Sequence, residues 1–498
     1  MSFSTVNKWL PQGTCLGRQG HCNQSRIYLI DAQGNLCTTA FHCRRNNASI
    51  MLTVLALLLT LITLFSTSLY GAATDFPQPK SLTPAVKLWK SVYSKINSNQ
   101  GFIHDNERMY VVYETITLKA KTRQGQNREI EKKLARYRTT LKRLGRRQSN
   151  RSTRLERKIL KAWGRRTPRM ALWRAADRVR FQRGQADRFR RSLERSGAYL
   201  SHIRQVLKDK KLPLELAALP HVESSFNPKV YSYKGAAGLW QFMPYTGKLF
   251  MRVDDIVDER LDVRKATVGA AGLLKQNYAL AQSWPLAVTG YNHGMSGMQQ
   301  AVRKLGTKDI GRIVKRYKSP SFGFASRNFY ASFLAASQIS SDPEKYFGKI
   351  KFSKPDNRPR VKTPAYFPTD KLAKRLGVNK KTLQKLNPAL LGPVWDDTKF
   401  IPKGYMLKLP GNKNTSVWRR TLSQLAKKIG RKGQKRELFH KVKKGESLAK
   451  IAKQYRVSLR LLLMRNNLHS RSRVRAGKKL RLPRTAWLRG RTTKTKKN

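Results

Sequence analysis

Hydrophobic positions recur at helical spacing along most of this chain, and short alternating runs typical of strands stand out mainly toward its C-terminal end. In the stretch KLPLELAALPHVESS, Pro213 suits the first turn of a helix. Counted on at helical spacing, one face carries Leu216, Leu219, Glu223 and Phe226. That face is apolar except for Glu223, and burial of an unpaired carboxylate is costly. The glutamate therefore requires a chemical explanation.

The same patterning divides the chain after residue 73 into segments. A basic region with helical periodicity precedes a stretch that is richer in Ala, Gly and Leu and has few strand signals. Two short units follow, and because their ends YMLKLP and KKLRLP look alike, they predict a repeated module. The tail TTKTKKN has the composition of a disordered segment. We expect boundaries at 74–184, 185–345, 362–410, 439–483 and 484–498.

The N-terminal part carries an apolar run, residues 50–69, that is preceded by arginines and followed by small residues. This pattern is typical of a secretory signal or a single membrane anchor, which we assign to residues 51–73. Residues 1–50 precede this segment and would not be needed for a secretory signal, which normally lies at the extreme N-terminus. Either translation starts at Met51, or an uncleaved anchor keeps a short tail inside, as the preceding arginines favour. All four cysteines lie within the first 43 residues, so we expect an exported chain without disulfides.

The formal net charge is +75, from 103 Lys and Arg against 28 Asp and Glu. Such a balance attracts polyanions, whether nucleic acid, anionic lipid or an acidic cell-wall polymer, so charge alone does not identify the partner. The region from Leu118 to Lys211 is the densest in Arg and Lys, with helix breaks expected at Gly145 and in RTPRM. The export signal and the absence of a known nucleic-acid module weigh against nucleic acid.

Three further motifs follow the glutamate in order: YSYKGAAGLWQFMPYTG at 231–247, PLAVTGYNHGMSG at 285–297 and ASRNFYASFLAASQ at 325–338. With HVESSFNP they resemble the catalytic domain of soluble lytic transglycosylases and goose-type lysozymes. The specific similarity is to the membrane-bound lytic murein transglycosylase D type, over about residues 185–345. The resemblance implies a mainly α, lysozyme-like catalytic domain that acts on peptidoglycan.

The chemistry of Glu223 agrees with that resemblance. An apolar pocket raises the pKa of a carboxyl group and keeps it protonated, as a general acid must be at neutral pH. The catalytic motifs offer no second carboxylate of the kind that ordinary glycoside hydrolysis requires. We interpret the nearby acidic cluster as helix-capping and ion-pairing residues with Arg260 and Arg264; it consists of Asp254, Asp255, Asp258 and Asp262.

In the family, the counterpart of Glu223 protonates the bond between N-acetylmuramic acid and N-acetylglucosamine. It then deprotonates the muramic O6, which attacks C1 and leaves a 1,6-anhydro end. The resemblance implies further residues that orient the sugar: Ser232, Gln241, Tyr291 and Asn292. It also implies that Tyr330 lines the cleft, although Ser326 stands where relatives carry an acid.

Two residues of these motifs have two interpretations each. Ser224 either orients Glu223 by a hydrogen bond or satisfies a helix end, and we include it with the substrate-binding residues. Trp240 either forms an aromatic wall for a sugar ring or packs in the core.

The C-terminal unit HKVKKGESLAKIAKQYRVSLRLLLMRNNLHSRSRVRAGKKLRLP resembles a LysM domain, a βααβ module that binds glycans containing N-acetylglucosamine. The resemblance places five residues near the ligand: Gly445, Glu446, Ser447, Asn466 and Asn467. Residues 362–410 resemble a diverged copy that lacks GESL, so a structural role competes with glycan binding there.

These features together predict a peptidoglycan lytic transglycosylase of the periplasm or cell envelope, with contact to the membrane through residues 50–69. The predicted partner is the peptidoglycan glycan strand, with no nucleic acid, cofactor, metal or obligate protein partner expected. A muramidase that admits water and a non-catalytic peptidoglycan-binding protein are the alternatives.

Overall fold

The computed structural model describes residues 28–30, 36–38, 75–146, 153–164, 166–435, 438–455, 457–466, 468–469 and 472–482. The contacts divide the chain into two units, Met1–Ala73 and Thr74–Asn498. Of the first unit, the structure describes only an antiparallel pair, β1 (Tyr28–Ile30) and β2 (Leu36–Thr38). The predicted signal or anchor and the basic tail at 484–498 lie outside the described residues. No described helix is both long and apolar enough to cross a membrane.

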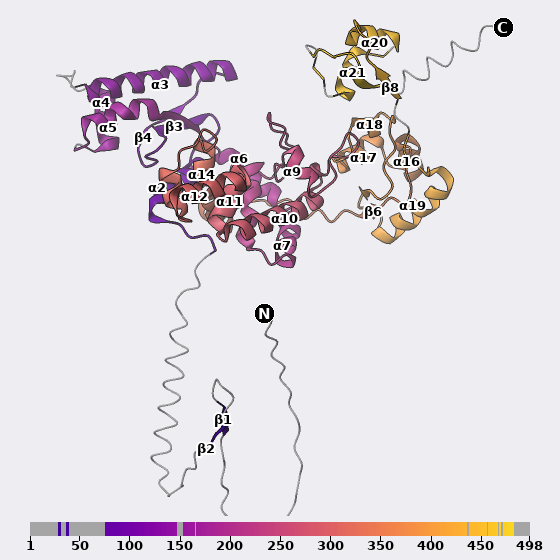
Figure 1. Cartoon of the computed structure of the whole chain (residues 1–498), viewed down its shortest axis with the longest axis horizontal. Helices are drawn as coiled ribbons and strands as arrows, with labels where there is room; N and C mark the ends of the chain where they lie inside the picture. Colours follow the sequence, from indigo (N-terminus) through magenta and orange to yellow (C-terminus); the bar gives the residue numbers. More distant parts are fainter. Residues whose placement is uncertain are drawn as a thin grey trace, which may run out of the picture. The chain divides into compact units, whose positions relative to one another are not determined.

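The second unit is mainly helical, as predicted, and its largest hydrophobic core draws on residues from Leu82 to Ile350 (Figure 1). Helix α14 (Phe324–Ser341) is central to it, with eleven buried residues. The helices around it are α2 (Thr83–Ser94), α6 (Ala186–Ser196), α7 (Leu200–Asp209), α8 (Leu219–Glu223), α10 (Val263–Ala281), α11 (Trp284–His293), α12 (Met295–Leu305) and α13 (Ile310–Arg316).

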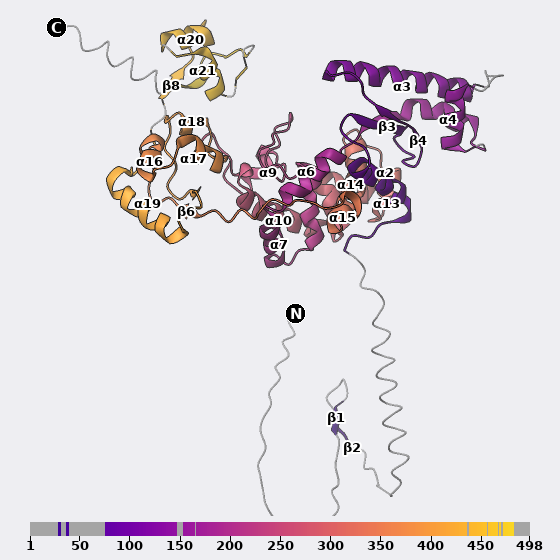
Figure 2. The same ribbon diagram turned by 180° about the vertical axis from the view of Figure 1, so that it is seen from behind.

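Helix α2 shows that the expected boundary at residue 185 is wrong. It packs along α14 in both views (Figures 1 and 2), and its Val86, Val92 and Tyr93 are almost fully buried in the same core. The apolar face of α2 is therefore part of the helical domain. Sequence reasoning missed this because the partner helix lies more than 200 residues further along the chain.

The segment between α2 and α6 forms an accessory layer. A three-stranded antiparallel sheet has the order β4-β3-β5, with β3 (Gln100–Asp105) between β4 (Val112–Thr117) and β5 (Val179–Arg183). Three helices join it around a second core: α3 (Arg123–Gly145), α4 (Arg154–Trp163) and α5 (Arg169–Ala175). The breaks predicted at Gly145 and in RTPRM are confirmed by the end of α3 and the start of α5, whereas the strands were not predicted.

Both C-terminal units begin and end with a strand and have two helices after the first strand, to which the first unit adds the short α18; we call them the first and last βααβ units. The first contains β6 (Arg360–Lys362), α16 (Thr369–Leu376), α17 (Lys380–Leu386), α18 (Gly392–Trp395) and β7 (Met406–Lys408), with β6 and β7 antiparallel. The second contains β8 (Leu438–Lys441), α20 (Leu448–Gln454), α21 (Leu459–Arg465) and β9 (Lys479–Leu482). Between them lies α19 (Thr415–Ile429), which packs on α16 and β6. The short helical segments elsewhere are η2 (Lys80–Leu82), η3 (Ala176–Arg178), η4 (Leu214–Ala218), α9 (Pro244–Lys248), η5 (Glu259–Leu261) and α15 (Glu344–Phe347).

One asparagine in each unit makes the same set of hydrogen bonds. Asn387 donates through Nδ2 to the carbonyls of Leu383 and Lys408, and its Oδ1 accepts from the Lys408 N–H. Asn466 does the same with Leu462 and Arg481. Because a side-chain amide with one donor and one acceptor group can mimic a peptide, each asparagine pairs with the last strand of its unit. This shared detail supports the predicted duplication.

The first βααβ unit is built into the helical domain. Its core includes Ala237, Val257 and Leu261 from the preceding domain. Backbone hydrogen bonds join the two at 2.8 Å, from the Asp258 N–H to the Ala389 carbonyl, and at 2.9 Å, from the Leu391 N–H to the Ile256 carbonyl. This unit therefore shares a continuous core with the domain that carries Glu223.

We expect Asn387→Ala to loosen this unit strongly. The change leaves the backbone N–H and carbonyl of Lys408 without their partner, and an unsatisfied buried polar group costs about 1–3 kcal/mol. The matched control is Asn379→Ala, which removes an exposed N-cap of α17 and should cost about 1 kcal/mol. Hydrogen exchange of the β6 and β7 amides in the intact chain measures both. Equal protection in the two variants would contradict the structural role of Asn387.

Candidate active site

Glu223 is the last residue of α8, on the apolar face that the sequence predicts. Pro213 precedes η4, and the chain continues directly into α8. Leu216, Leu219 and Phe226 are each 0% exposed. The predicted face is therefore confirmed, but the helix ends at Glu223 and Phe226 reaches the core from beyond it.

The chain leaves Glu223 through an unusual reversal. Ser225 and Phe226 have φ values of 51° and 54°, a left-handed conformation that non-glycine residues rarely adopt. The Phe226 N–H donates to the Pro220 carbonyl at 2.9 Å. The guanidinium of Arg195, on α6, donates twice to the Ser225 carbonyl. These contacts hold a strained turn directly after the carboxyl group, as is common where a functional side chain must be fixed.

The Glu223 side chain stands in apolar surroundings without losing all access to solvent. The residue is half-buried, and desolvation raises the pKa of its carboxyl to about 8. The charge of Glu223 in turn helps to raise the pKa of the Tyr93 and Tyr291 hydroxyls, so both tyrosines lie within its electrostatic reach. Among the described residues, no hydrogen bond or ion pair to the Glu223 carboxylate is formed. Desolvation thus dominates, and the acid is protonated at neutral pH.

Ser224 joins α8 to the second motif. Its hydroxyl donates to the Leu239 carbonyl at 2.7 Å and to the Pro220 carbonyl at 3.3 Å. Of the two predicted interpretations, the structure therefore shows Ser224 at a helix end. The same hydroxyl fixes the GLWQ segment beside Glu223.

The loop at 231–242 is folded by the residues expected to contact sugar. Ser232 accepts from the Ala236 N–H at 2.9 Å, and Gln241 donates through Nε2 to the Gly238 carbonyl at 2.8 Å. Gly238 has φ 80°, and a Cβ there would lie 1.8 Å from the Arg260 carbonyl oxygen, so only glycine fits. The side-chain carbonyl of Gln241 has no hydrogen bond within the described part of the chain and is free to accept one.

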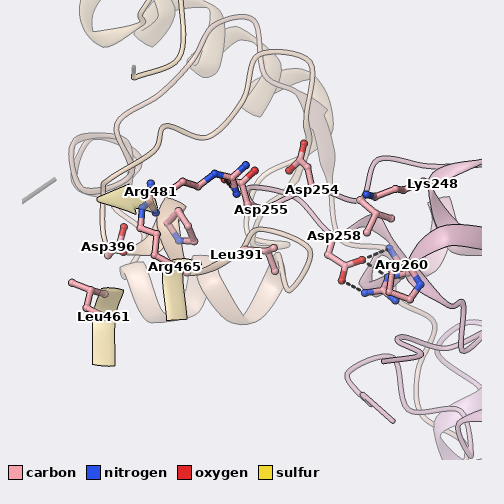
Figure 3. Close-up of a pocket in the computed structure, with 14 residues that line it drawn as sticks. Lys248, Asp254, Asp255, Asp258, Arg260, Leu391, Asp396, Leu461, Arg465 and Arg481 are labelled. Atoms are coloured by element: carbon pink, nitrogen blue, oxygen red, sulfur yellow. Dashed lines mark hydrogen bonds and ion pairs between the residues drawn. The ribbon is translucent and has the colours of Figure 1, made fainter. Parts of the chain in front are cut away.

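The buried guanidinium of Arg260 holds the loop at 231–242 in place. It binds the Asp258 carboxylate through Nε and an N–H₂ group, each at 2.8 Å (Figure 3). It also donates to the carbonyls of Gly235 and Phe242. Both members of the ion pair are buried, and bidentate geometry satisfies them. Arg260 therefore fixes the loop at both ends.

The other acidic residues of this cluster are held in the same way. Asp262 caps α10 and forms an ion pair with Arg360 at 2.7 Å. Asp254 pairs with Arg252, and Asp255 with Arg481 (Figure 3). The prediction of capping and ion pairing is confirmed, although Arg264 contributes its backbone N–H to Asp262 and no ion pair.

The third motif lies on α11. The Tyr291 hydroxyl donates to the Trp240 carbonyl at 2.7 Å, which brings the second and third motifs together beside Glu223. Asn292 is exposed and accepts a hydrogen bond from Ser326 on α14 at 3.1 Å. Trp240 is 0% exposed and donates to Thr267, so its ring belongs to the core and forms no sugar-facing wall.

Tyr330 was predicted to line the cleft, and the structure corrects this. Its side chain is 1% exposed, and its hydroxyl donates to the Pro77 carbonyl at 2.8 Å. Sequence reasoning instead missed Tyr93 and Arg195, because the contacts that bring α2 and α6 to Glu223 are tertiary. It also gave no role to His221, which is buried, bonds Ser192 at 2.6 Å and has its pKa lowered to about 3 by burial.

In the C-terminal unit, Gly445 has φ 78° and Ser447 caps α20. Glu446 accepts from the Lys443 N–H at 2.7 Å and lies 2.6 Å from His440 Nε2. The side-chain amide of Asn466 is fully used by the strand contacts described above, so its predicted place at the glycan is corrected to a structural one. Asn467 lies outside the described residues.

Across the described ranges, no three His, Cys, Asp or Glu side chains come together as a metal site.

Comparison with known families assigns two parts of the chain. The profile of the Transglycosylase SLT domain matches residues 202–314, and that of the LysM domain matches residues 440–483. The first range contains Glu223 and the second and third motifs, and the second range coincides with the last βααβ unit. The chain therefore contains an SLT-type transglycosylase domain and a LysM domain.

Among curated proteins, the chain is similar to membrane-bound lytic murein transglycosylase D of Escherichia coli (strain K12), with 26% identity over 202 residues. That match covers 40% of this chain and 44% of the relative, so the chain spans less than half of its length. A putative tributyltin chloride resistance protein of Alteromonas sp. (strain M-1) is 32% identical over 116 residues, which cover 23% of this chain and 56% of that protein.

Among solved structures, the soluble lytic transglycosylase SLT70 from Escherichia coli matches with 20% identity and a TM-score of 0.27, over 46% of this chain and 36% of that one. The lytic transglycosylase Slt from Pseudomonas aeruginosa, as an inactive mutant, matches with 17% identity and a TM-score of 0.25, over 40% and 32% of the two chains.

We expect Arg260→Met to destabilise the loop at 231–242. Removal of one member of a buried ion pair costs about 3–5 kcal/mol, because the remaining charge stays buried. Arg252→Met is the matched control: its pair with Asp254 is partly exposed, and exposed pairs contribute about 0–1 kcal/mol. Hydrogen exchange at residues 235–242, together with thermal unfolding of the intact chain, measures the difference. Similar losses in both variants would refute the supporting role of Arg260.

Proposed function

We propose that this chain is a peptidoglycan lytic transglycosylase, which cleaves the β-1,4 bond between N-acetylmuramic acid and N-acetylglucosamine and forms 1,6-anhydromuramic ends. The observation that carries the proposal is that, among the described residues, the Glu223 carboxyl has no hydrogen-bond or ion-pair partner. Its pKa is raised to about 8 by desolvation alone, with no contribution from another acid. The SLT-domain match over the same residues and the similarity to murein transglycosylases support it.

The reaction needs one group that first donates and then accepts a proton. Glu223 donates its proton to the bridging oxygen as the bond from that oxygen to the muramic C1 breaks. The resulting carboxylate takes the proton of the muramic O6 hydroxyl as O6 bonds to C1, and Glu223 returns to its protonated form. Because O6 is tethered to the same ring, its attack has the large effective concentration of an intramolecular group.

The residues around Glu223 are suited both to the step in which it donates a proton and to the step in which it accepts one. The Tyr93 and Tyr291 hydroxyls stay neutral, because burial raises the pKa of each, so they add no charge beside the acid. Tyr291, Asn292 and the free carbonyl of Gln241 are our candidates for binding the sugar and its acetamido group. Ser224 and Ser232 act through the loop that they fold, and so serve as positioning residues.

Hydrolysis, the main alternative, requires a second carboxylate to activate water or to attack C1. The candidates are Asp254, Asp255, Asp258 and Asp262, and each already forms an ion pair with an arginine. The pairs of Asp258 and Asp262 are buried, so neither can act as a general base without breaking the structure around it, and the carboxylates of Asp254 and Asp255 are each occupied by an arginine. The observation therefore favours the anhydro product over a reducing end.

The remaining parts of the chain fit a protein directed to the cell wall. The LysM domain at 440–483 is proposed to bind glycan, with Gly445 and Ser447 near the ligand. The first βααβ unit is proposed to be structural, because it shares its core with the catalytic domain. We further propose export to the periplasm or cell envelope, with residues 50–69 as signal or membrane anchor.

We expect wild-type protein to release muropeptides with 1,6-anhydromuramic ends, each lighter by one water than the hydrolysis product. Glu223→Gln keeps the shape and removes the proton, so the rate should fall by about 10²–10⁴-fold, the range typical of a lost general acid. Glu215→Gln is the matched control, because Glu215 is exposed and only eight residues earlier. Mass spectrometry of digested cell walls measures both the product and the rate.

Two outcomes would contradict this proposal in different ways. Reducing muramic ends would identify a hydrolase and would make the four aspartates the residues to test as the missing base. Wild-type activity in Glu223→Gln would remove Glu223 from the chemistry altogether.

The pH dependence of activity follows from the raised pKa of Glu223. Because the acid form starts the reaction, kcat/KM should be flat through neutral pH and should fall as pH rises through about 8. An unperturbed glutamate would lose its proton above about pH 4.3. Cleavage of short soluble glycans at constant ionic strength tests this, with binding to Glu223→Gln over the same pH range as the control. A decline centred between pH 4 and 5 would refute the buried-acid mechanism.

A further inference from the structure

Strand β5 borders a hollow of about 980 Å³ that the proposed mechanism does not use. Strand β5 is an edge strand, and the start of α3 and the start of α6 lie beside it. Six basic side chains line the hollow, against Glu131 as the single acid among its lining residues: Lys121, Arg123, Arg138, Arg180, Arg183 and Arg188. We call this hollow the arginine groove.

The arginines of the groove crowd each other. Burial lowers the pKa of the Arg183 guanidinium, and the charges of Arg188 and Arg123 lower it further. Burial and the charge of Arg327 act in the same direction on the pKa of Arg180. Of the five groove arginines, Arg138 forms an ion pair with Glu131 at 3.7 Å, and within the described part of the chain the other four form none. Six basic residues gathered around one carboxylate leave an excess of positive charge that favours binding of an anion.

Two of these side chains are held in place by neutral contacts. Arg183 donates to the Ser98 carbonyl at 2.7 Å and to Gln126 Oε1 at 3.1 Å. The Arg180 guanidinium lies over the ring of Phe324, 3.9 Å from its centroid. A guanidinium stacked on an aromatic ring keeps its N–H groups available for a carboxylate or phosphate. The groove is thus preorganised, unlike a charge on a mobile exposed side chain.

The groove is connected to the candidate active site through the start of α14. Two residues after Phe324, which lies under Arg180, comes Ser326, whose hydroxyl donates to Asn292 at 3.1 Å. Asn292 follows Tyr291, which lies within reach of the Glu223 charge. Arg327, adjacent to Ser326, is the arginine that acts on Arg180. A line of polar and cationic side chains therefore runs from the sugar-binding motif to β5.

We propose that the arginine groove binds the carboxylate-bearing peptide branches of the glycan strand whose sugars occupy the active site. This inference rests on the proposed function, because the substrate polymer then brings its own acidic peptides to the enzyme. Arginine pairs with carboxylates through two parallel hydrogen bonds, and the crowded guanidinium groups gain most from such a partner. The accessory layer would thereby select strands that still carry peptides.

The test compares peptide-bearing glycan strands with the same strands after an amidase has removed the peptides. Arg123→Gln/Arg188→Gln, in the full chain with Glu223→Gln to prevent cleavage, removes two exposed groove charges from two different elements. The matched control is Arg419→Gln/Arg420→Gln, which removes two exposed charges from α19. Fluorescence anisotropy of labelled strands measures affinity, and thermal unfolding confirms that both variants fold.

We expect the groove variant to lose about tenfold in affinity for peptide-bearing strands and less than twofold for stripped strands, because two exposed charge contacts contribute about that much. The control variant should lose less than twofold for both. Equal losses in the two variants would show general charge attraction, and an equal loss on stripped strands would show that the groove does not bind peptides. Displacement by an RNA oligonucleotide at lower concentration than by free stem peptide would favour nucleic acid and also overturn the proposal.

This binding test is separate from the test of function. If wild-type protein yields no anhydro product while the groove variant still loses affinity for peptide-bearing strands, the proposed function fails and the groove assignment stands. If the anhydro product forms and the groove variant binds both strands like the control, only the groove assignment fails.

Discussion

The site depends on keeping a carboxyl group protonated in a chain that carries 103 Lys and Arg residues. A single guanidinium beside Glu223 would lower its pKa and remove the proton that the chemistry needs. Two arginines of the elements around Glu223 are bound to other groups: Arg195 binds the Ser225 carbonyl, and Arg260 binds Asp258 and two loop carbonyls. Desolvation is therefore left as the only influence on the pKa of Glu223. Because cations must be kept away from the Glu223 carboxyl, the positions of α6, α8 and the loop at 231–242 are constrained together.

Much of this could be predicted from sequence, because the motifs are local. The apolar face with Glu223, the order of the three later motifs and the βααβ units follow from spacing within short windows. Tyr93 could not be found in this way, since it reaches Glu223 only when α2 packs on α14. The left-handed Ser225 and Phe226 were hidden for the same reason: nothing in SSF favours positive φ, and Arg195 and the core impose it.

The wrong assignments share one physical cause. Tyr330 and Asn466 have polar groups that suit a ligand as well as a protein partner. The fold uses them internally, for Pro77 in one case and for the last strand of the LysM domain in the other. Residue type gives the hydrogen-bonding capacity of a side chain, but only the packing decides where that capacity is used. Tyr291, exposed Asn292 and the free carbonyl of Gln241 stay our candidates for binding a substrate.

The first βααβ unit cannot be treated as an independent module that is exchanged between related proteins. This unit is structurally part of the catalytic domain, because it forms hydrogen bonds with residues 256 and 258 and shares a core with it. An exchange of this unit between relatives would separate its core from Ala237, Val257 and Leu261 of the helical domain, so we expect the unit to diverge in sequence together with the segments that it contacts. The LysM domain after α19 has a core of its own, and an ion pair between Arg481 and Asp255 connects it to the helical domain. The two similar units thus differ in what constrains their sequences. The first must keep a core that it shares with the catalytic domain, whereas the core of the LysM domain is formed by its own residues.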